Sequence, residues 1–520
     1  AQKIFYEKWK SSLIPNHVEN PHLLPERKKN NEILKASDLR ARDPSKARIL
    51  YLDAELPNPS KGGGFGRSFD NLSMIAELGH RVTVASYTKT TDKWCDWSCR
   101  EKIQEMGIEV FPGSWEEMAE ERIGFYEIVI VSRPTIFRLT HLFFRNMFQK
   151  SPFAIVYDSE ALWYRRDADL LRLYQQGIQF PSIGEETLSV EEKELMTSTD
   201  KRSEVKLLGM ADVVVTVSDN EKEIASAFNP SASIETIGHV MSEDNQAASV
   251  TGFYERGGIL FVASFGDKMY YNGDACWYFL KEIYPNVLKL SPSMMLTIAG
   301  RNIPQYLRTF VRENGLDHVV RFEESPESLH QLFESHRVFI APHLYGSGIQ
   351  FKLSEAMSFG IPCAMSKLSA DAFGITKDSD VACIGDDPES FGACVVSLHK
   401  DADKWYTLRE NGKTFIRQTH SRHRVLGIWS QVIAEAKRKY NAMKGADGKA
   451  GKRSAEVPHS ALFSSDIWVP TEACPEGEAL YLKMYPDVGA ALGEKMFQSA
   501  FVHWRDYGNH EGRSYVCMQT

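Results

Sequence analysis

The chain has 520 residues, of which 43% are hydrophobic and 25% are charged. This balance is typical of folded globular proteins and excludes a disordered chain, and the length predicts about three domains. The formal net charge of −8 gives no general attraction for nucleic acid. We therefore expect no nucleic-acid partner.

The sequence contains no run that approaches the ~18 apolar residues of a membrane-spanning helix. The first residues, AQKIFYEKWK, lack the layout of a signal peptide, although numbering from Ala1 leaves an upstream anchor open. We expect a cytoplasmic protein, with room for peripheral association with the cytosolic face of a membrane. The eight cysteines are scattered, so we expect most of them to be reduced thiols. Cys95 and Cys99 lack nearby Cys or His partners for zinc, and we expect no metal site.

The first half of the chain has the pattern of a parallel sheet. A polar stretch, 1–46, precedes the apolar run ARILYLDAELP, a Gly-rich loop that leads into an amphipathic helix (KGGGFGRSFDNLSMIAELGH), and a second apolar run, RVTVAS. Similar runs return in YEIVIVSRP, FAIVYDSE and ADVVVTVSD, separated by segments of helical length. Buried strands alternating with helices predict a Rossmann-like α/β domain.

The same pattern restarts near residue 256 with GILFVASF and continues through MMLTIAG, VVRFEE, RVFIAPH and IPCAMS. Two doubly wound domains in tandem place a cleft between the carboxyl ends of their strands. The small, polar and basic segment after the last long helix is typical of a linker. The expected divisions are an N-terminal arm (1–46), a first domain (47–250), a second domain (251–440), a linker (441–465) and a small, mostly helical module (466–520).

Residues 345–363, YGSGIQFKLSEAMSFGIPC, carry the clearest functional pattern. Gly346 and Gly348 lie in a loop between a buried strand and a helix, where glycine lets the backbone approach a ligand. The helix start offers unpaired N–H groups to an anion, and Lys352 adds a full positive charge. Glu355, one turn later, can accept hydrogen bonds from the two hydroxyls of a ribose. A glycine turn followed by surface charges is the competing interpretation of the spacing alone.

This stretch resembles the nucleotide-binding signature of retaining family 4 glycosyltransferases, which have the GT-B fold. Further landmarks of the resemblance are ARILYLDAELPNPSKGGGFGR, MADVVVTVSDNE, GILFVASF and LTIAGRNIP, so it covers roughly residues 47–440. The resemblance implies that Lys352 binds phosphate and that Glu355 holds the ribose. Many members have a glutamate that touches the transferred sugar where this chain has Ser347, and a related subgroup has a small residue there. The identity of the sugar therefore stays open.

Three further residues are donor-site candidates in the second domain. Arg301 follows a strand end and could pair with a phosphate as a planar bidentate donor, although a surface arginine is an equally good interpretation. Lys268 and Asn272 follow the first strand of this domain, where the related subgroup has donor contacts.

In the first domain the candidates are Gly62, Gly63, Gly64 and Arg67 of the Gly-rich loop, which could face a phosphate or an acceptor across the cleft. Two more segments resemble the wall of an acceptor site, with a structural ion-pair network as the alternative. Their charged residues are Arg133, Asp158, Glu160, Arg165 and Arg166.

Taken with the resemblance, these residues predict a retaining glycosyltransferase. It would move a sugar from a nucleotide-diphosphate sugar to a glycan, lipid-linked or protein acceptor, with no cofactor. Lys352, Arg301 and the helix start would stabilise the leaving diphosphate, so we expect no requirement for metal. The alternatives are a catalytically silent GT-B module with a binding or assembly role and a sugar-nucleotide epimerase.

The C-terminal segment resembles a short Tyr-Pro-Asp-Val unit that is appended to various bacterial proteins. Tyr481, Tyr485, Trp504 and Tyr507 could stack on sugars, but in so small a module aromatic residues are more often the core.

Overall fold

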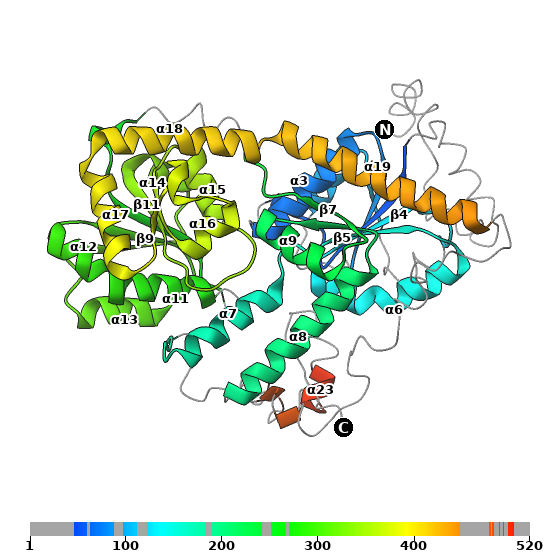
Figure 1. The fold of residues 1–520 in the computed structure, drawn as a ribbon, viewed down its shortest axis with the longest axis horizontal. Helices are drawn as coiled ribbons and strands as arrows, with labels where there is room; N and C mark the ends of the chain where they lie inside the picture. Colours follow the sequence, from blue (N-terminus) through cyan, green and yellow to red (C-terminus); the bar gives the residue numbers. More distant parts are fainter. Residues whose placement is uncertain are drawn as a thin grey trace.

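The protein contains two Rossmann-like domains, each built on one parallel sheet (Figure 1). The computed structural model describes residues 46–59, 63–87, 97–111, 122–181, 190–241, 251–266 and 270–447, with short pieces between 478 and 503. Within these ranges no helix is both long and apolar enough to cross a membrane.

The first domain has a seven-stranded parallel sheet in the order β3-β2-β1-β4-β5-β6-β7. The strands are β1 (Arg48–Asp53), β2 (Arg81–Ser86), β3 (Glu109–Val110), β4 (Ile128–Ser132), β5 (Ala154–Asp158), β6 (Val213–Thr216) and β7 (Ser233–Thr236). The helices are α3 (Gly63–Glu77), α4 (Trp97–Glu105), α6 (Pro134–Lys150), α7 (Trp163–Gln175), α8 (Val190–Met210) and α9 (Asp219–Phe228).

Both faces of this sheet are buried, which explains why its strands are nearly continuous apolar runs. Successive side chains of a strand point to opposite faces. Accordingly, Leu50 and Leu52 of β1 belong to one hydrophobic core, and Ile49 and Tyr51 belong to the core on the other face. The apolar runs that predicted the strands therefore also explain why helices pack on both faces of the sheet.

The second domain has a six-stranded parallel sheet in the order β10-β9-β8-β11-β12-β13. Its strands are β8 (Gly257–Ser264), β9 (Leu296–Arg301), β10 (Val320–Glu324), β11 (His336–Ala341), β12 (Cys363–Ser366) and β13 (Cys383–Gly385). Its helices are α11 (Tyr270–Tyr278), the π-helical turn η5 (Phe279–Ile283), α12 (Tyr284–Leu290), α13 (Gln305–Glu313), α14 (Leu329–Ser335), α15 (Phe351–Ser358), α16 (Lys367–Phe373), α17 (Pro388–Lys400) and α18 (Ala402–Thr419).

Each sheet reverses its strand order at one point, between β1 and β4 in the first domain and between β8 and β11 in the second. Ligands of open parallel sheets bind outside the carboxyl ends of the strands at such a reversal. The loops at these points are the Gly-rich loop before α3 and the segment 342–350 before α15. The sequence patterns singled out for function therefore follow strands at the two reversal points.

Helix α19 (Arg422–Asp447) crosses back from the second domain to the first (Figure 1). Its apolar face enters the core of the first domain through Val425, Trp429, Val432, Ile433, Ala436 and Tyr440. The indole of Trp429 is fully buried and donates a hydrogen bond of 3.0 Å to Asn71 Oδ1. Residues 422–440 were expected in the second domain, but their buried contacts lie with the first.

Two cysteines form a bond that the sequence did not predict. Cys383 of β13 and Cys394 of α17 form a disulfide, whereas Cys276 and Cys363 are buried free thiols. In the C-terminal pieces, Tyr481 is fully buried, packs with Val488, Ala500 and Phe501, and contacts His503 through its hydroxyl. It is thus a core residue, while Tyr485, Trp504 and Tyr507 lie outside the described residues.

The loop before α15 packs directly against the first domain. Glu221 of α9 is buried, and its Oε1 accepts a hydrogen bond of 3.0 Å from Leu162 N and another of 3.0 Å from Gly348 N. Gly348 has a φ of +68°, and a Cβ there would lie 3.2 Å from Ala161 Cβ and 3.2 Å from Val217 Cγ2. Glycine therefore allows the two domains to meet at this point.

We predict that Gly348→Ala destabilises the protein by about 1–2 kcal/mol, because the left-handed backbone conformation costs that much for alanine and the added methyl group presses on the first domain. Differential scanning calorimetry should record a melting temperature lower by roughly 2–4 °C per kcal/mol. Gly427→Ala is the control, since Gly427 is exposed on α19 with nothing within 4 Å of its added Cβ. Equal melting temperatures for both variants would contradict the packing described here.

We predict that Trp429→Ala destabilises the protein by about 3–5 kcal/mol, because it removes a buried ring and leaves a cavity between α19 and the first sheet. Urea unfolding followed by far-UV circular dichroism measures the loss. Tyr254→Ala provides the comparison, since Tyr254 is 83% exposed and its removal should change stability little. A similar unfolding curve for the two variants would show that α19 is not anchored by Trp429.

Candidate functional site

The carboxyl edge of the second sheet presents the loop 342–350 and the start of α15. Gln350 is the residue before the helix, and its side chain makes no capping hydrogen bond within the described structure. The first turn of α15 therefore has backbone N–H groups available to an anion. Gly346, Ser347 and Gly348 are partly exposed in the loop that leads to this turn.

Lys352 and Glu355 lie on the same side of α15. Lys352 Nζ is 2.6 Å from Glu355 Oε2, and the two side chains are 31% and 20% exposed, respectively. An ion pair with this exposure contributes little to stability, because water screens it. The pair therefore holds a cation and a carboxylate close together while leaving both within reach of a ligand.

Asn272 holds two segments of this edge together. Its Nδ2 donates to Ser264 O at the end of β8 (2.7 Å), and its Oδ1 lies 3.1 Å from Nε2 of His343, just after β11. Burial lowers the pKa of His343 to about 4, so the neutral ring donates from Nε2 to Asn272. With both ends of its amide occupied, Asn272 positions the loops around the site. Lys268 lies outside the described residues.

Arg301 is exposed at the last position of β9, and its carbonyl accepts a hydrogen bond from Phe265 N. In the sheet order, β8 lies between β9 and β11. Arg301 is thus on the same carboxyl edge as the loop 342–350 but one strand removed from it. The structure places it next to the segment that follows β8, where a guanidinium can reach a ligand lying across that strand end.

In the first domain, α3 begins at Gly63, at the end of the Gly-rich segment. A Cβ at Gly64 would collide with the carboxylate of Glu160, so glycine allows the first turn of α3 to approach this side chain. The backbone of Glu160 is also near the loop 342–350 of the second domain, because a Cβ at Gly348 would lie 3.6 Å from Glu160 O. Glu160 therefore lies beside Gly64 of its own domain and Gly348 of the other.

Glu160 is part of a chain of buried and half-buried charges at the ends of the strands β1, β4 and β5. Arg133 Nε donates to Asp53 Oδ1 (2.7 Å), and Arg133 Nη1 donates to Glu160 Oε2 (2.6 Å). Arg133 and Glu160 have φ values of 77° and 56°, which non-glycine residues adopt only at a cost. Burial raises the pKa of Glu160, and the nearby Arg133 opposes that rise. Strained, charged residues at strand ends are typical of binding and catalytic sites.

Arg67 has a different role from the one expected for it. It is 2% exposed; its Nη1 donates to Asp158 Oδ2 (2.7 Å), and its Nε and Nη2 donate to Ile237 O (3.2 and 2.9 Å). A guanidinium with these partners is tied to the sheet edge and to the chain that leaves β7. Arg67 therefore stabilises the edge instead of presenting its charge to a ligand across the cleft.

The structure adds His239 and Glu221 to the residues around the cleft, and the sequence patterns pointed to neither of them. His239 is buried, and its ring centroid lies 4.9 Å from that of Phe351, the first residue of α15. Burial lowers its pKa well below the usual value, and the positive charges of Arg67 and Lys352 lower it further. Glu221 could have been found as the acidic residue that follows the Ser218 N-cap of α9.

The start of α15 and Lys352 have the charge that suits a phosphate, and Glu355 has the acceptor atoms that suit hydroxyl groups. Arg133 and Glu160 contribute a strained, charged pair at the strand ends of the first domain. Among the described residues, no group of three or more His, Cys, Asp or Glu side chains is placed to hold a metal ion.

Part of the second domain is similar to a described protein family. Residues 256–401 match the model of the family "Glycosyl transferases group 1". The chain is also 24% identical over 155 residues to an uncharacterized 44.6 kDa protein in the cps region of Klebsiella pneumoniae. That match covers 29% of this chain and 39% of the relative, so it spans less than half of the relative's length.

Solved structures resemble the whole two-domain arrangement. Anabaena Alr3699/HepE, solved in complex with UDP and glucose, has a TM-score of 0.52 and 12% identity, and the match covers 75% of this chain and 99% of that one. Sucrose-phosphate synthase from Thermosynechococcus elongatus has a TM-score of 0.53 and 15% identity, with 77% and 100% covered. A glycosyltransferase from Rickettsia africae has a TM-score of 0.52 and 11% identity, with 75% and 99% covered. The chain therefore has the GT-B fold, and its residues 256–401 match the glycosyl transferases group 1 model.

Proposed function

We propose that this protein is a glycosyltransferase that takes a sugar from a nucleotide-diphosphate sugar. The observation that carries the proposal is the Lys352–Glu355 pair on α15, which follows the loop of Gly346 and Gly348 and lies inside the group 1 domain. In this assignment the diphosphate binds at the start of α15 and beside Lys352, and Glu355 accepts hydrogen bonds from the ribose.

A uridine nucleotide is the first donor to test, because Anabaena Alr3699/HepE was solved with UDP, with UDP and glucose, and with UDP-glucose. The choice of base and sugar for this chain depends on side chains around the loop 342–350 and Ser347. A nucleotide that carries two phosphates matches the charge available there, namely Lys352, Arg301 and the helix start.

The proposed chemistry follows from the charges that form in the transition state. As the bond between the sugar and the diphosphate breaks, negative charge grows on the diphosphate and positive charge on the sugar ring. Lys352 and the N–H groups of α15 stabilise the negative charge on the diphosphate, and Arg301 is a further donor. Protein cations in this position support transfer without a metal ion, and the resemblance to family 4 supports retention of anomeric configuration.

A second candidate is a module that binds the nucleotide sugar without transferring it. The observation that favours it is Ser347, which has a hydroxyl where many family 4 members have a carboxylate. Binding with no turnover on any acceptor separates this candidate from the enzyme. For the enzyme, a glycan, lipid-linked or protein acceptor and a cytoplasmic location remain parts of the proposal.

We predict that Glu355→Ala weakens binding of the correct nucleotide by roughly 1.5–3 kcal/mol, because the ribose hydroxyls lose a charged acceptor. Isothermal titration calorimetry with UDP and a panel of other nucleoside diphosphates measures this. Glu435→Ala is a matched control, because Glu435 and Arg438 form the same kind of i,i+3 pair at 2.6 Å on α19, away from the site. Unchanged affinity in a folded Glu355→Ala protein would refute the ribose assignment.

We predict that Lys352→Ala lowers kcat more than it weakens ground-state binding of the donor, because its charge matters most when the leaving diphosphate forms. Release of the nucleoside diphosphate from the sugar nucleotide, with and without acceptor, gives kcat and KM. Lys367→Ala on α16 serves as the control, since Lys367 makes an exposed i,i+4 pair with Asp371. Equal losses in kcat and affinity would assign Lys352 to simple binding.

A further inference from the structure

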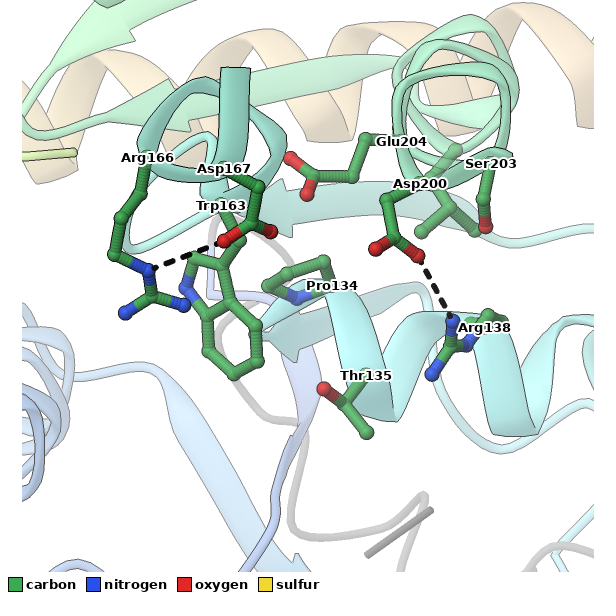
Figure 2. A pocket seen from close by; sticks show the side chains of 10 residues that line it. Pro134, Thr135, Arg138, Trp163, Arg166, Asp167, Asp200, Ser203 and Glu204 are labelled. Atoms are coloured by element: carbon green, nitrogen blue, oxygen red, sulfur yellow. Dashed lines mark ion pairs between the residues drawn. The ribbon is translucent and has the colours of Figure 1, made fainter. Parts of the chain in front are cut away.

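A second hollow lies entirely within the first domain, between the starts of α6 and α7 and the middle of α8 (Figure 2). The centres of water molecules have a volume of about 60 Å³ available to them in this hollow. Because one water needs ~10–15 Å³ of this volume, the hollow has room for the hydroxyl-bearing edge of a molecule and not for a whole oligosaccharide. Its main polar and aromatic lining residues are Arg138, Trp163, Arg166, Asp167, Ser203 and Glu204.

Buried polar atoms without partners point to a ligand here. Glu204 is 5% exposed, and its Oε1 accepts a hydrogen bond of 2.8 Å from Tyr164 N. Its Oε2 and the hydroxyl of Ser203 are buried and have no hydrogen-bond partner among the described residues. A buried polar atom without a partner costs free energy, and a ligand that bonds to it removes that cost. Both atoms belong to residues that line the hollow.

The ion pairs around the hollow are long. Arg166 Nε is 3.9 Å from Asp167 Oδ1, and Arg138 Nη1 is 4.0 Å from Asp200 Oδ1. The separation between Arg166 and Asp167 exceeds hydrogen-bond length, so a molecule that enters between these two groups can bond to both. Figure 2 shows these two pairs on either side of Glu204, with the carboxylates of Asp167 and Asp200 turned toward α6.

The charges of the lining favour a neutral occupant. Two guanidinium groups face the carboxyl groups of Asp167, Asp200 and Glu204. Burial raises the pKa of Asp167 to about 6 and raises that of Glu204 well above its usual range. The rise favours the neutral form of Glu204, so guanidinium, carboxyl and hydroxyl groups all line the hollow. The hydroxyl groups of a ligand both donate and accept hydrogen bonds, and they match a lining of this kind.

One wall of the hollow is the indole of Trp163, and Arg166 lies 6.0 Å from that ring and 5.5 Å from the ring of Tyr271 in the second domain. An aromatic face beside converging donors and acceptors suits a sugar ring, which has an apolar face of C–H groups and an edge of hydroxyls. Two residues that line the hollow are also near Arg133 and Glu160 in the sequence. Pro134 follows Arg133, and Trp163 comes three residues after Glu160.

We propose that this hollow binds a neutral sugar ring of the acceptor, with Trp163 against the ring face and Ser203 and Glu204 bonded to its hydroxyls. This inference rests on the proposed function, and it narrows the acceptor to a molecule that already carries a sugar. Incoming sugar and acceptor sugar would then meet beside Arg133 and Glu160, where the two domains are in contact.

Saturation-transfer NMR tests the proposal with a panel of methyl glycosides of glucose, galactose, mannose and N-acetylglucosamine, added to the full chain with and without UDP. We expect at least one glycoside to bind, and to bind at least about tenfold more weakly to Trp163→Leu and more weakly to Ser203→Ala. Tyr254→Leu changes an exposed aromatic residue elsewhere and should bind as the unmodified protein does. The melting temperature and UDP affinity of each variant show whether it is folded.

The outcomes separate the two proposals. Glycoside binding that depends on Trp163 supports the sugar site, even if UDP fails to bind and the donor assignment falls. UDP binding with no glycoside signal, or glycoside binding that survives both Trp163→Leu and Ser203→Ala, overturns the sugar site and leaves the donor assignment standing. Ethanolamine and sodium acetate are run alongside, and binding of one of them in place of every glycoside would show that the hollow selects a charged ligand.

Discussion

One buried carboxylate joins the two domains of this protein. Glu221 Oε1 accepts the backbone N–H of Leu162 from its own domain and that of Gly348 from the other domain. Burial raises the pKa of Glu221, while these two hydrogen bonds lower it. A buried carboxylate needs such donors. The hydrogen bond from Gly348 to Glu221 therefore holds the loop of Gly346 and Gly348 next to the strand ends of the first domain. The position of the donor-side loop relative to Glu160 follows from this contact.

A second set of charges shapes the edge of the first sheet on which that contact rests. Arg67 joins Asp158 to the carbonyl of Ile237, and Arg133 joins Asp53 to Glu160. Two atoms of the second group, Asp53 Oδ2 and Arg133 Nη2, are buried without partners among the described residues. Arg67 and Asp158 thus complete their hydrogen bonds within the protein. Asp53 and Arg133 keep unused bonding capacity near the point where the two domains meet, which is the arrangement expected of groups that contact a substrate.

Much of the fold could be predicted because its strands are short and buried on both faces. Runs such as Ile128–Ser132 and Ala154–Asp158 are apolar up to their last residue, as is typical of strands that are buried on both faces of a parallel sheet. The loop and helix around Lys352 and Glu355 could be predicted too, because the functional groups there are close in sequence. The disulfide between Cys383 and Cys394 was missed, because the positions of scattered cysteines in a long chain do not show which of them pair. The return of α19 to the first domain was missed because periodicity shows an apolar face but not what covers it.

The sequence by itself determined the two parallel sheets, the Gly-rich loops that follow their strands and the pairing of a lysine with a glutamate on one helix. All of these depend on residues that are neighbours in the chain, where period and spacing act directly. Only the tertiary structure decided that Arg67 is a structural residue, that Glu221 bridges the domains and that Trp163, Ser203 and Glu204 surround one hollow. Those roles depend on which buried charge finds which partner across distances of 40 to 170 residues in the chain, and no local pattern carries that information.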